Sequence, residues 1–340
     1  MIKMSVKTIL LLVVILAASC KKDDESIKKI EPTVYVGGDG QFGNHSQIKY
    51  WKDGLEVPMS TDAYGGISLS MFVDGKDVYV AGQGLTGYSL GAKYWKNQTA
   101  VNLTEEHSSI LNDIVGIARD IYVFNKDVYV AGYEWNGTED VAAYWKNGES
   151  VHLSSDPHSE ATSIFVTETD VYIAGNEWNG KNSVARYWKN GKVVNLTDEP
   201  SSAQAITVVD NNVYVLVNSY DKGISYWKNG TQIKVTSGEP KTIAYDFFVS
   251  GSDVYIVGGE WNGEDYLGKY WKNGVGTDIR DKDSYAITTC IYVLDDDIYI
   301  GGYLSPYGKP ATAVYWKNGV MTKLTNGTSS SFASDICVIK

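Results

Sequence analysis

Short apolar runs that alternate with polar positions recur along this chain, and their spacing is that of strands and not of helices. One run reads Asp-Val-Tyr-Val-Ala-Gly or a close variant, and its Tyr is found at Tyr35, Tyr79, Tyr129, Tyr172, Tyr214, Tyr255 and Tyr299. Six residues before each of these Tyr except the first, a Val closes another apolar run. A third run ends in Tyr-Trp-Lys, and residues 192–197 exemplify a fourth. Each unit is therefore predicted to contain four strands, called a, b, c and d in chain order.

The phrase Tyr-Trp-Lys-Asn-Gly, or a near variant, marks the repeat. Its Trp occurs seven times, at Trp51, Trp95, Trp145, Trp188, Trp227, Trp271 and Trp316. A period of about 44 residues is the length of a four-stranded propeller blade. The first unit starts at Val34 without strand a, whereas Phe332 to Lys340 has the pattern of strand a. We therefore predict an all-β fold over residues 33–340: a seven-bladed β-propeller of four-stranded antiparallel blades, closed by the C-terminal strand joining blade one.

Asn-Gly pairs occur at two places in the repeat and predict two-residue type I′ turns, which need positive φ at both positions. Between strands b and c, such a turn at residues 136–137 places Tyr129 opposite Tyr144. The same count in two other blades gives the pairs Tyr172 and Tyr187, and Tyr255 and Tyr270. Between strands c and d the turns are predicted at Asn147-Gly148, Asn190-Gly191, Asn229-Gly230, Asn273-Gly274 and Asn318-Gly319.

Two recurring residues are interpreted as structural. Tyr and Trp are adjacent in strand c, so they point to opposite faces of a blade, and the seven Trp are expected to pack between blades. An Asp precedes strand b in most units and is expected to cap the a-to-b turn. These residues are Asp77, Asp127, Asp170, Asp253 and Asp297.

The connections are expected on two faces of the ring. The a-to-b and c-to-d turns are short and form one face, here called the turn face, whereas the more varied b-to-c and d-to-a connections form the other, the loop face. Each b-to-c tip carries an aromatic residue: Phe42, Tyr88, Trp135, Trp178, Tyr220, Trp261 and Tyr307.

Three of these tips read Glu-Trp-Asn-Gly and are the candidate ligand-binding site. An indole can stack on a sugar ring while a carboxylate and an amide bind hydroxyl groups, and repetition adds avidity. The alternative is that each Trp is a cross-strand residue that covers the neighbouring blade. The candidate ligand-binding residues are Trp135, Trp178, Trp261, Glu134, Glu177, Glu260, Asn136, Asn179 and Asn262.

The other polar groups of the loop face do not have the pattern of a metal site, and neither a metal ion nor a cofactor is predicted. The d-to-a loops contain many acids, but they lack an Asp-x-Asp-x-Asp run for calcium, so solvated surface charge is the better interpretation. His107 and His158 lie in consecutive loops without a recurring third zinc ligand. No catalytic residues are assigned, because no blade carries a distinctive Ser, His, Asp or Tyr grouping and the sialidase box is absent.

The first residues are predicted to be an export signal. Lys3 and Lys7 precede an apolar run that is too short to span a bilayer and ends in small residues. Residues 16–20, Leu-Ala-Ala-Ser-Cys, resemble the lipobox of bacterial lipoproteins, which implies a signal peptide at 1–19 and lipidation of Cys20. Residues 20–32 then form the lipidated Cys and a charged tether. The stretch Lys-Lys-Asp-Asp-Glu at 21–25 resembles the signal that exports lipoproteins of Bacteroidota to the cell surface, although a simple spacer would have the same composition.

The charge balance excludes one class of partner. The formal net charge of −11 becomes −13 once Lys3 and Lys7 are removed with the signal peptide. Nucleic acid is therefore not an expected partner, because no basic stripe is present to neutralise phosphates, and contact with the membrane is expected through the lipid alone. Cys290 and Cys337 fall on inner strands of neighbouring blades with unfavourable geometry for a disulfide, so both are expected to be free.

With these features the chain resembles the seven-repeat propeller lipoproteins of Bacteroidota and, in part, kelch repeats, through the double glycine after strand b. The resemblance implies a lipoprotein of the outer membrane, displayed at the cell surface, and supplies no activity. The protein is expected to be a monomer. The leading hypothesis is a non-catalytic binding protein that captures a glycan or a host or partner protein on the loop face. The alternatives are a periplasm-facing scaffold for outer-membrane assembly and a polysaccharide-cleaving propeller enzyme.

Overall fold

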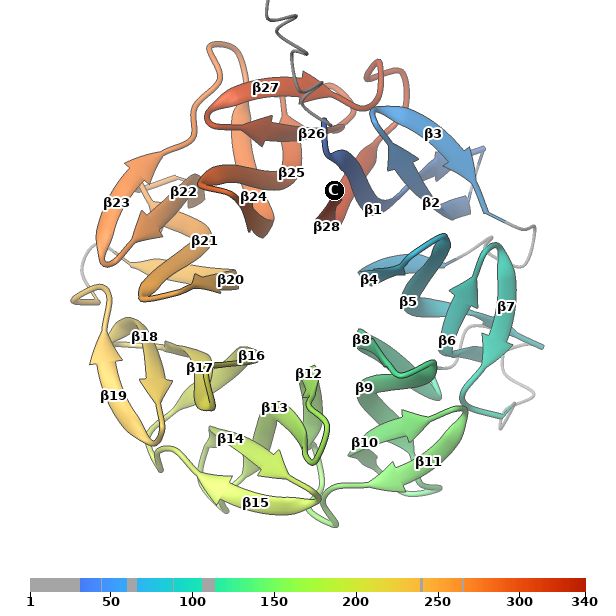
Figure 1. Cartoon of the computed structure of the whole chain (residues 1–340), viewed down its shortest axis with the longest axis vertical. Helices are drawn as coiled ribbons and strands as arrows, with labels where there is room; N and C mark the ends of the chain where they lie inside the picture. Colours follow the sequence, from blue (N-terminus) through green and yellow to red (C-terminus); the bar gives the residue numbers. More distant parts are fainter. Residues whose placement is uncertain are drawn as a thin grey trace, which may run out of the picture. The chain divides into compact units, whose positions relative to one another are not determined.

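The computed structural model describes residues 31–43, 45–59, 66–87, 89–105, 114–238, 241–264 and 266–340. In this part of the chain, seven four-stranded antiparallel sheets are arranged in a ring (Figure 1), and the innermost strands line a central channel. The predicted seven-bladed β-propeller is confirmed. The signal peptide at 1–19, the lipidated Cys20 and residues 20–30 of the tether lie outside the described residues and remain predictions.

Each blade runs outward from the channel in the order a, b, c, d. The inner strands a, which line the channel, are β28 (Ser331–Ile339), β4 (Ile67–Asp74), β8 (Gly116–Phe124), β12 (Glu160–Val166), β16 (Ser201–Val209), β20 (Thr242–Ser250) and β24 (Tyr285–Leu294). The strands b are β1 (Thr33–Phe42), β5 (Asp77–Thr86), β9 (Asp127–Trp135), β13 (Val171–Trp178), β17 (Asn212–Ser219), β21 (Asp253–Trp261) and β25 (Asp297–Ser305).

The two outer strands of each blade are c and d, and every strand d has four residues. The strands c are β2 (His45–Lys52), β6 (Ser89–Lys96), β10 (Asp140–Lys146), β14 (Ser183–Lys189), β18 (Gly223–Lys228), β22 (Tyr266–Lys272) and β26 (Thr312–Lys317). The strands d are β3 (Leu55–Pro58), β7 (Thr99–Asn102), β11 (Glu149–His152), β15 (Lys192–Asn195), β19 (Thr231–Lys234), β23 (Val275–Asp278) and β27 (Val320–Lys323). Blade 1 consists of β28 and β1 to β3, and blades 2 to 7 follow in chain order.

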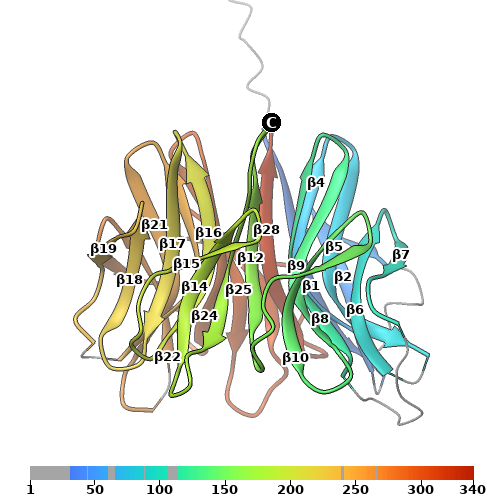
Figure 2. The same ribbon diagram turned by 90° about the horizontal axis from the view of Figure 1, so that it is seen from below.

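The C-terminal strand closes the ring, as predicted. β28 pairs antiparallel with β1, so that Thr33 lies opposite Ile339 and Tyr35 opposite Cys337. The start of β1 and the end of β28 therefore lie together on the turn face, and the b-to-c and d-to-a loops emerge at the opposite end of the strands (Figure 2).

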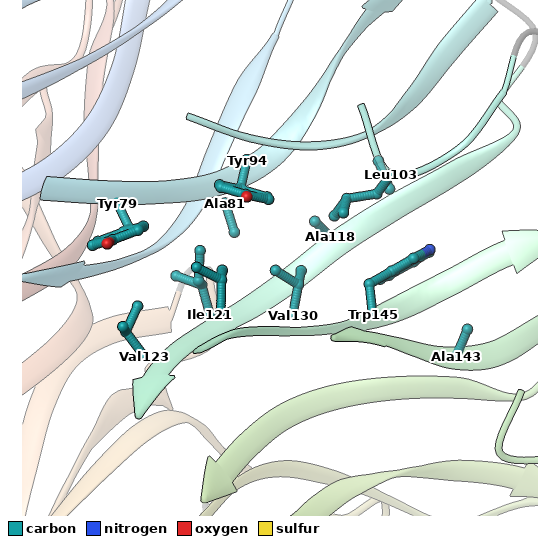
Figure 3. Close-up of a cluster of buried hydrophobic side chains, with 12 residues drawn as sticks. Tyr79, Ala81, Tyr94, Leu103, Ala118, Ile121, Val123, Val130, Ala143 and Trp145 are labelled. Carbon is teal, nitrogen blue, oxygen red and sulfur yellow. The ribbon is translucent and has the colours of Figure 1, made fainter. Parts of the chain in front are cut away.

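The repeated Trp residues pack between blades, which confirms their predicted role. All seven are buried, with exposed fractions between 0 and 4 %. Trp145 of blade 3, for example, shares a buried cluster with Tyr79, Ala81 and Leu103 of blade 2 (Figure 3). Each of the seven interfaces contains such a cluster with one of these Trp. Burial of a large aromatic side chain contributes about 2–3 kcal/mol, so the repeated phrase stabilises the ring at every interface.

The Asp before strand b has a different role from the predicted turn cap. In blade 3, Asp127 Oδ1 accepts a hydrogen bond from Asn147 Nδ2 at 2.9 Å, and Asp127 Oδ2 pairs with Lys146 Nζ at 3.0 Å. Asn147 Oδ1 in turn accepts from the backbone N–H of Val128 at 2.9 Å, and Lys146 Nζ lies 5.1 Å from the centroid of the Tyr129 ring. The Asp therefore joins strands b and c, because the Lys-Asn of the repeated phrase lies beside it.

The predicted register of the b-to-c hairpins is wrong by two residues. Trp135 pairs with Asp140, and Tyr129 lies opposite Lys146 instead of Tyr144. The loop contains four residues because Asn136 Oδ1 accepts hydrogen bonds from the backbone N–H groups of residues 138 and 139, at 3.0 Å each. The same shift occurs at Tyr172 and Tyr255, which lie opposite Lys189 and Lys272. A shift of two residues leaves every side chain on its predicted face, so the blade packing is unaffected.

The c-to-d turns have the predicted form. Lys146 pairs with Glu149, and the intervening Asn147 and Gly148 have φ values of 52° and 90°, as a type I′ turn requires. The other four predicted Asn-Gly pairs also have positive φ at both positions.

Candidate functional site

The three Glu-Trp-Asn-Gly tips lie on the loop face and expose their indole rings. Trp135, Trp178 and Trp261 are the last residues of their b strands, and their exposed fractions are 38, 43 and 38 %. They differ in this respect from the seven Trp of the repeated phrase, which are buried. Two of the three tips belong to neighbouring blades 3 and 4, and the third belongs to blade 6.

The Glu of each tip contacts a polar or basic partner on its own blade. Glu134 accepts a hydrogen bond from Ser150 Oγ at 2.5 Å and contacts His152 Nε2. Glu177 Oε2 lies 3.7 Å from Arg186 Nε, and Glu260 Oε1 lies 2.8 Å from Lys269 Nζ. Successive residues of a strand face opposite sides, so each carboxylate lies on the other face of the strand from its neighbouring indole.

The Asn of each tip shapes the loop. The Oδ1 atoms of Asn136, Asn179 and Asn262 accept backbone N–H groups two residues further along the chain, at 2.8–3.0 Å. Asn179 Nδ2 also donates to the carbonyl of Asp198 in the adjacent d-to-a loop at 3.1 Å. These bonds favour a structural function for the amide oxygens, and the binding role assigned to the nine tip residues stays a prediction.

The tip of blade 6 borders a pocket between blades 6 and 7. Trp261 packs on its cross-strand partner Tyr266, with ring centroids 5.2 Å apart. Beside it, a cavity of about 430 Å³ is lined by Asn262, Tyr285, Tyr307 and residues of the 279–286 loop. Tyr307 is 99 % exposed. Of the other aromatic tips, Tyr220 is 70 % exposed, whereas Tyr88 and the side chain of Phe42 lie outside the described residues.

Two acids in or beside the d-to-a loops are paired with arginines. Glu160 Oε2 lies 3.1 Å from Arg119 Nη2, and Asp198 Oδ1 lies 3.2 Å from Arg186 Nη2. His107 lies outside the described residues. Among the residues that the structure does describe, no group of three His, Cys, Asp or Glu side chains is arranged to hold a metal ion.

A second cavity is the central channel, about 1120 Å³ in volume, and the sequence did not point to it. Its lining comes from inner strands of all seven blades. Toward the turn face, aromatic rings of neighbouring inner strands pack on one another. The ring centroid of Tyr122 lies 5.0 Å from that of Phe72 and 4.9 Å from that of Phe165. On the other side of the channel, Phe248 and Tyr292 lie 4.9 Å apart.

Three aspartates at equivalent positions anchor the inner strands to one another. Asp335 Oδ2 accepts from the backbone N–H of Met71 at 2.7 Å, and the matching bonds run from Ile164 to Asp120 at 2.8 Å and from Ile291 to Asp246 at 2.9 Å. Each bond joins one blade to the next. Desolvation between the blades raises the pKa of Asp246 to about 8 and that of Asp335 to about 7, against the opposing effect of the backbone N–H groups.

The two cysteines of the ring are free thiols, as expected. Cys290 is buried at the position that Asp246 occupies in the preceding blade, and Cys337 lines the channel. Burial raises the pKa of the Cys337 thiol to about 12, so it is protonated at neutral pH.

The comparisons with known proteins define the fold class alone. The sequence matches no family model and no curated protein. Among solved structures it is similar to an acylaminoacyl peptidase of Pyrococcus horikoshii, with a TM-score of 0.53 at 12% identity over 87% of this chain. It is also similar to the β-propeller domain of the Trilobed protease of Pyrococcus furiosus, with a TM-score of 0.54 at 9% identity over 87% of this chain and 93% of that chain. A prolyl endopeptidase matches with a TM-score of 0.51 at 9% identity over 91% of this chain and 50% of that chain.

These similarities place the chain among β-propellers. It spans about half the length of the acylaminoacyl peptidase, 52% of that chain, and identities near 10% carry no information on activity. The described residues contain no helix that is long and apolar enough to cross a bilayer.

Proposed function

We propose that this chain is a lipid-anchored, cell-surface binding protein that captures a glycan on its loop face without catalysing a reaction. The observation that supports the proposal is the contrast between two sets of Trp in one repeat. Seven are buried between blades, whereas Trp135, Trp178 and Trp261 leave about two fifths of their surface exposed at hairpin tips. Exposed indoles on a rigid scaffold are suited to stacking against the apolar faces of sugar rings.

The Glu side chains of the tips would take part from the opposite face of each strand. Glu134, Glu177 and Glu260 are held by partners on their own blades, and a carboxylate oxygen retains acceptor capacity for a sugar hydroxyl. Each contact contributes little by itself, so affinity would come from simultaneous binding at neighbouring tips of one glycan chain.

A triple substitution tests the binding site. Trp135→Ala, Trp178→Ala and Trp261→Ala together, in the full chain purified in detergent, are expected to lower glycan-array binding by a factor of at least ~10, since each lost stacking contact is worth about 1 kcal/mol. The melting temperature should stay close to that of the parent chain because these side chains are half exposed. Tyr220→Ala is the matched control, an exposed aromatic tip without the Glu-Trp-Asn-Gly sequence. Unchanged binding by the triple variant would exclude these tips as the site.

Protease treatment of intact cells tests the display. The loop face is expected to be cleaved in cells that carry the parent chain, and Cys20→Ser is expected to release the protein from the membrane fraction. Complete protection in intact cells, with cleavage only after the outer membrane is opened, would instead support the periplasmic scaffold.

A further inference from the structure

Every inner strand carries one β-bulge, and the seven bulges lie at equivalent positions. In blade 3, Ala118 pairs with Gly132 and Asp120 pairs with Ala131, which leaves Arg119 as the extra residue. A bulge re-aims its extra side chain, and bulges are common beside functional sites. All seven extra residues line the channel: Leu69, Arg119, Thr162, Gln204, Tyr245, Thr289 and Ser334.

The type of side chain at the bulge position differs between the seven units. The interblade Trp is the same in all seven units, whereas the bulge residues include an apolar, a cationic, an amide, an aromatic and several hydroxyl side chains. The seven bulge residues therefore form a channel surface that does not share the sevenfold symmetry of the ring. This surface lies in the half of the channel nearer the loop face, because each inner strand runs from the loop face through the bulge to the turn face.

One half of this surface, on blades 3 to 5, is polar. Arg119 Nη2 pairs with Glu160 Oε2 at 3.1 Å, and Gln204 Nε2 donates to Ser202 Oγ at 2.7 Å. Arg119, Glu160, Ser202 and Gln204 all line the cavity. Arg119 Nε is buried and has no hydrogen-bond partner among the residues that the structure describes. A buried donor of this kind is uncommon in proteins.

The other half, on blades 6, 7 and 1, carries three aromatic rings beside the bulge residues Thr289 and Ser334. Tyr245 is 39 % exposed to the channel region, and the Tyr303 and Phe332 rings lie 4.9 Å apart at 86°. All three residues line the cavity. Blades 3 to 5 and blades 6, 7 and 1 stand on opposite sides of the ring (Figure 1), so the aromatic wall faces the polar wall across the channel.

We propose that this part of the channel binds the terminal residue of a glycan as a neutral sugar ring, which rests on the proposed glycan capture at the loop face. The aromatic wall of Tyr245, Tyr303 and Phe332 stacks on the C–H face of the ring. The polar wall of Arg119, Glu160 and Gln204 binds its hydroxyl groups.

The chemistry of the two walls selects this ligand class. A sugar ring has an apolar face and a polar edge, which matches an aromatic wall opposite a polar one. The ion pair of Arg119 with Glu160 leaves this wall close to neutral, so a charged ligand would leave one of the two side chains unpaired. The closed ring admits a chain only by its end, and about 1120 Å³ is ample for one sugar residue.

The test compares glycans that differ only at the terminus. A glycan array is probed with the full chain in detergent, and each bound glycan is paired with a counterpart whose terminal residue is blocked by O-methylation of its hydroxyl groups. The parent chain is expected to bind the unblocked member of each pair more tightly, by a factor of ~10 or more, which corresponds to the loss of a hydrogen bond and a stacking contact. Arg119→Met and Tyr245→Ala should each remove this preference, whereas Tyr245→Phe should retain it, because the ring remains. Leu69→Ala is the control, since it alters a bulge residue that belongs to neither wall.

The outcomes separate this proposal from the proposed loop-face function. Equal binding of blocked and unblocked glycans by the parent chain, or a preference that survives both Arg119→Met and Tyr245→Ala, would overturn the channel site and leave the loop-face site standing. Loss of preference in the channel variants with unchanged binding in the triple Trp variant would retain the channel site and exclude the Trp tips. If no glycan binds the parent chain, both proposals are wrong. Circular dichroism melts confirm that each variant is folded.

Discussion

At the scale of single residues, the ring depends on polar side chains that bond one inner strand to the next. Asp246 accepts backbone N–H groups from Phe247 of its own strand and Ile291 of the next blade, at 2.7 and 2.9 Å. These bonds satisfy backbone donors of β20 and β24, which are edge strands with a neighbouring strand on one side alone. The cost is a desolvated carboxyl group near two like charges, Asp335 and Asp120, which raises the pKa of Asp246 to about 8.

This pKa predicts how stability depends on pH. A carboxyl group whose pKa rises from 3.8 in the unfolded chain to about 8 in the folded ring binds more protons when folded, so folding is favoured at low pH. Its contribution is fully present below pH 3.8 and is lost as the pH rises through about 8. We expect the melting temperature to fall as the pH is raised from 5 to 8, and Asp246→Asn to flatten this slope. Scanning fluorimetry at one-unit pH steps measures it, and a melting temperature that rises over this range in the parent chain would contradict the assignment.

At the scale of secondary-structure elements, two Asn-Gly sequences give two different hairpins. Asn147-Gly148 forms a two-residue turn because both residues take positive φ and the Asn side chain bonds outward to Asp127 and Val128. Asn136-Gly137 forms a four-residue loop because the Asn side chain bonds inward to Thr138 and the residue after it. Residue preference predicts that a turn exists, and the partner of the Asn side chain decides its length.

The c-to-d turn offers a direct test of this account. Gly148 has a φ of 90°, and a Cβ at this position would meet no atom within 4 Å, so its substitution affects the backbone alone. Gly148→Ala is expected to destabilise the fold by about 1 kcal/mol or slightly more, measured by urea unfolding. Glu149→Ala, an exposed change at the next residue, should have little effect. Equal unfolding midpoints for the two variants would show that the positive φ carries no strain.

The same elements show how far the sequence predicts this protein. Strand order, blade number and the buried Trp residues follow from a periodic pattern in which every unit repeats the same buried positions. The bulges leave no such signal, because their side chains at Arg119, Gln204 and Tyr245 share neither type nor polarity. The candidate tips at Trp135 and Trp178 could be located by their hairpins, whereas the channel site requires residues from blades far apart in the chain to be placed around one axis.

At the scale of the whole molecule, stability depends on a ring that one strand completes. β28 pairs with β1 and contributes Ala333, Ile336 and Val338 to the cluster between blades 7 and 1. It also reaches blade 2, where Asp335 accepts the backbone N–H of Met71 and Cys337 packs against the cluster between blades 1 and 2. One short strand therefore belongs to two interblade interfaces as well as to its own sheet.

Removal of residues 331–340 is accordingly expected to have a larger effect than the loss of any single side chain. It would expose the ladder edge of β1, delete three buried apolar residues of one interface and leave the Met71 N–H without its acceptor. We expect the truncated chain to melt at least ~10 °C lower than the parent and to self-associate through the exposed edge, as seen by gel filtration.

A chain that lacks only Lys340, which is exposed, is the control and should behave as the parent. A synthetic peptide of residues 331–340 added to the truncated chain should restore part of the lost stability, because the closing strand binds through backbone pairing and needs no covalent link to blade 7. A truncated chain that stays monomeric and melts with the parent would show that the remaining blade contacts hold the ring closed without β28.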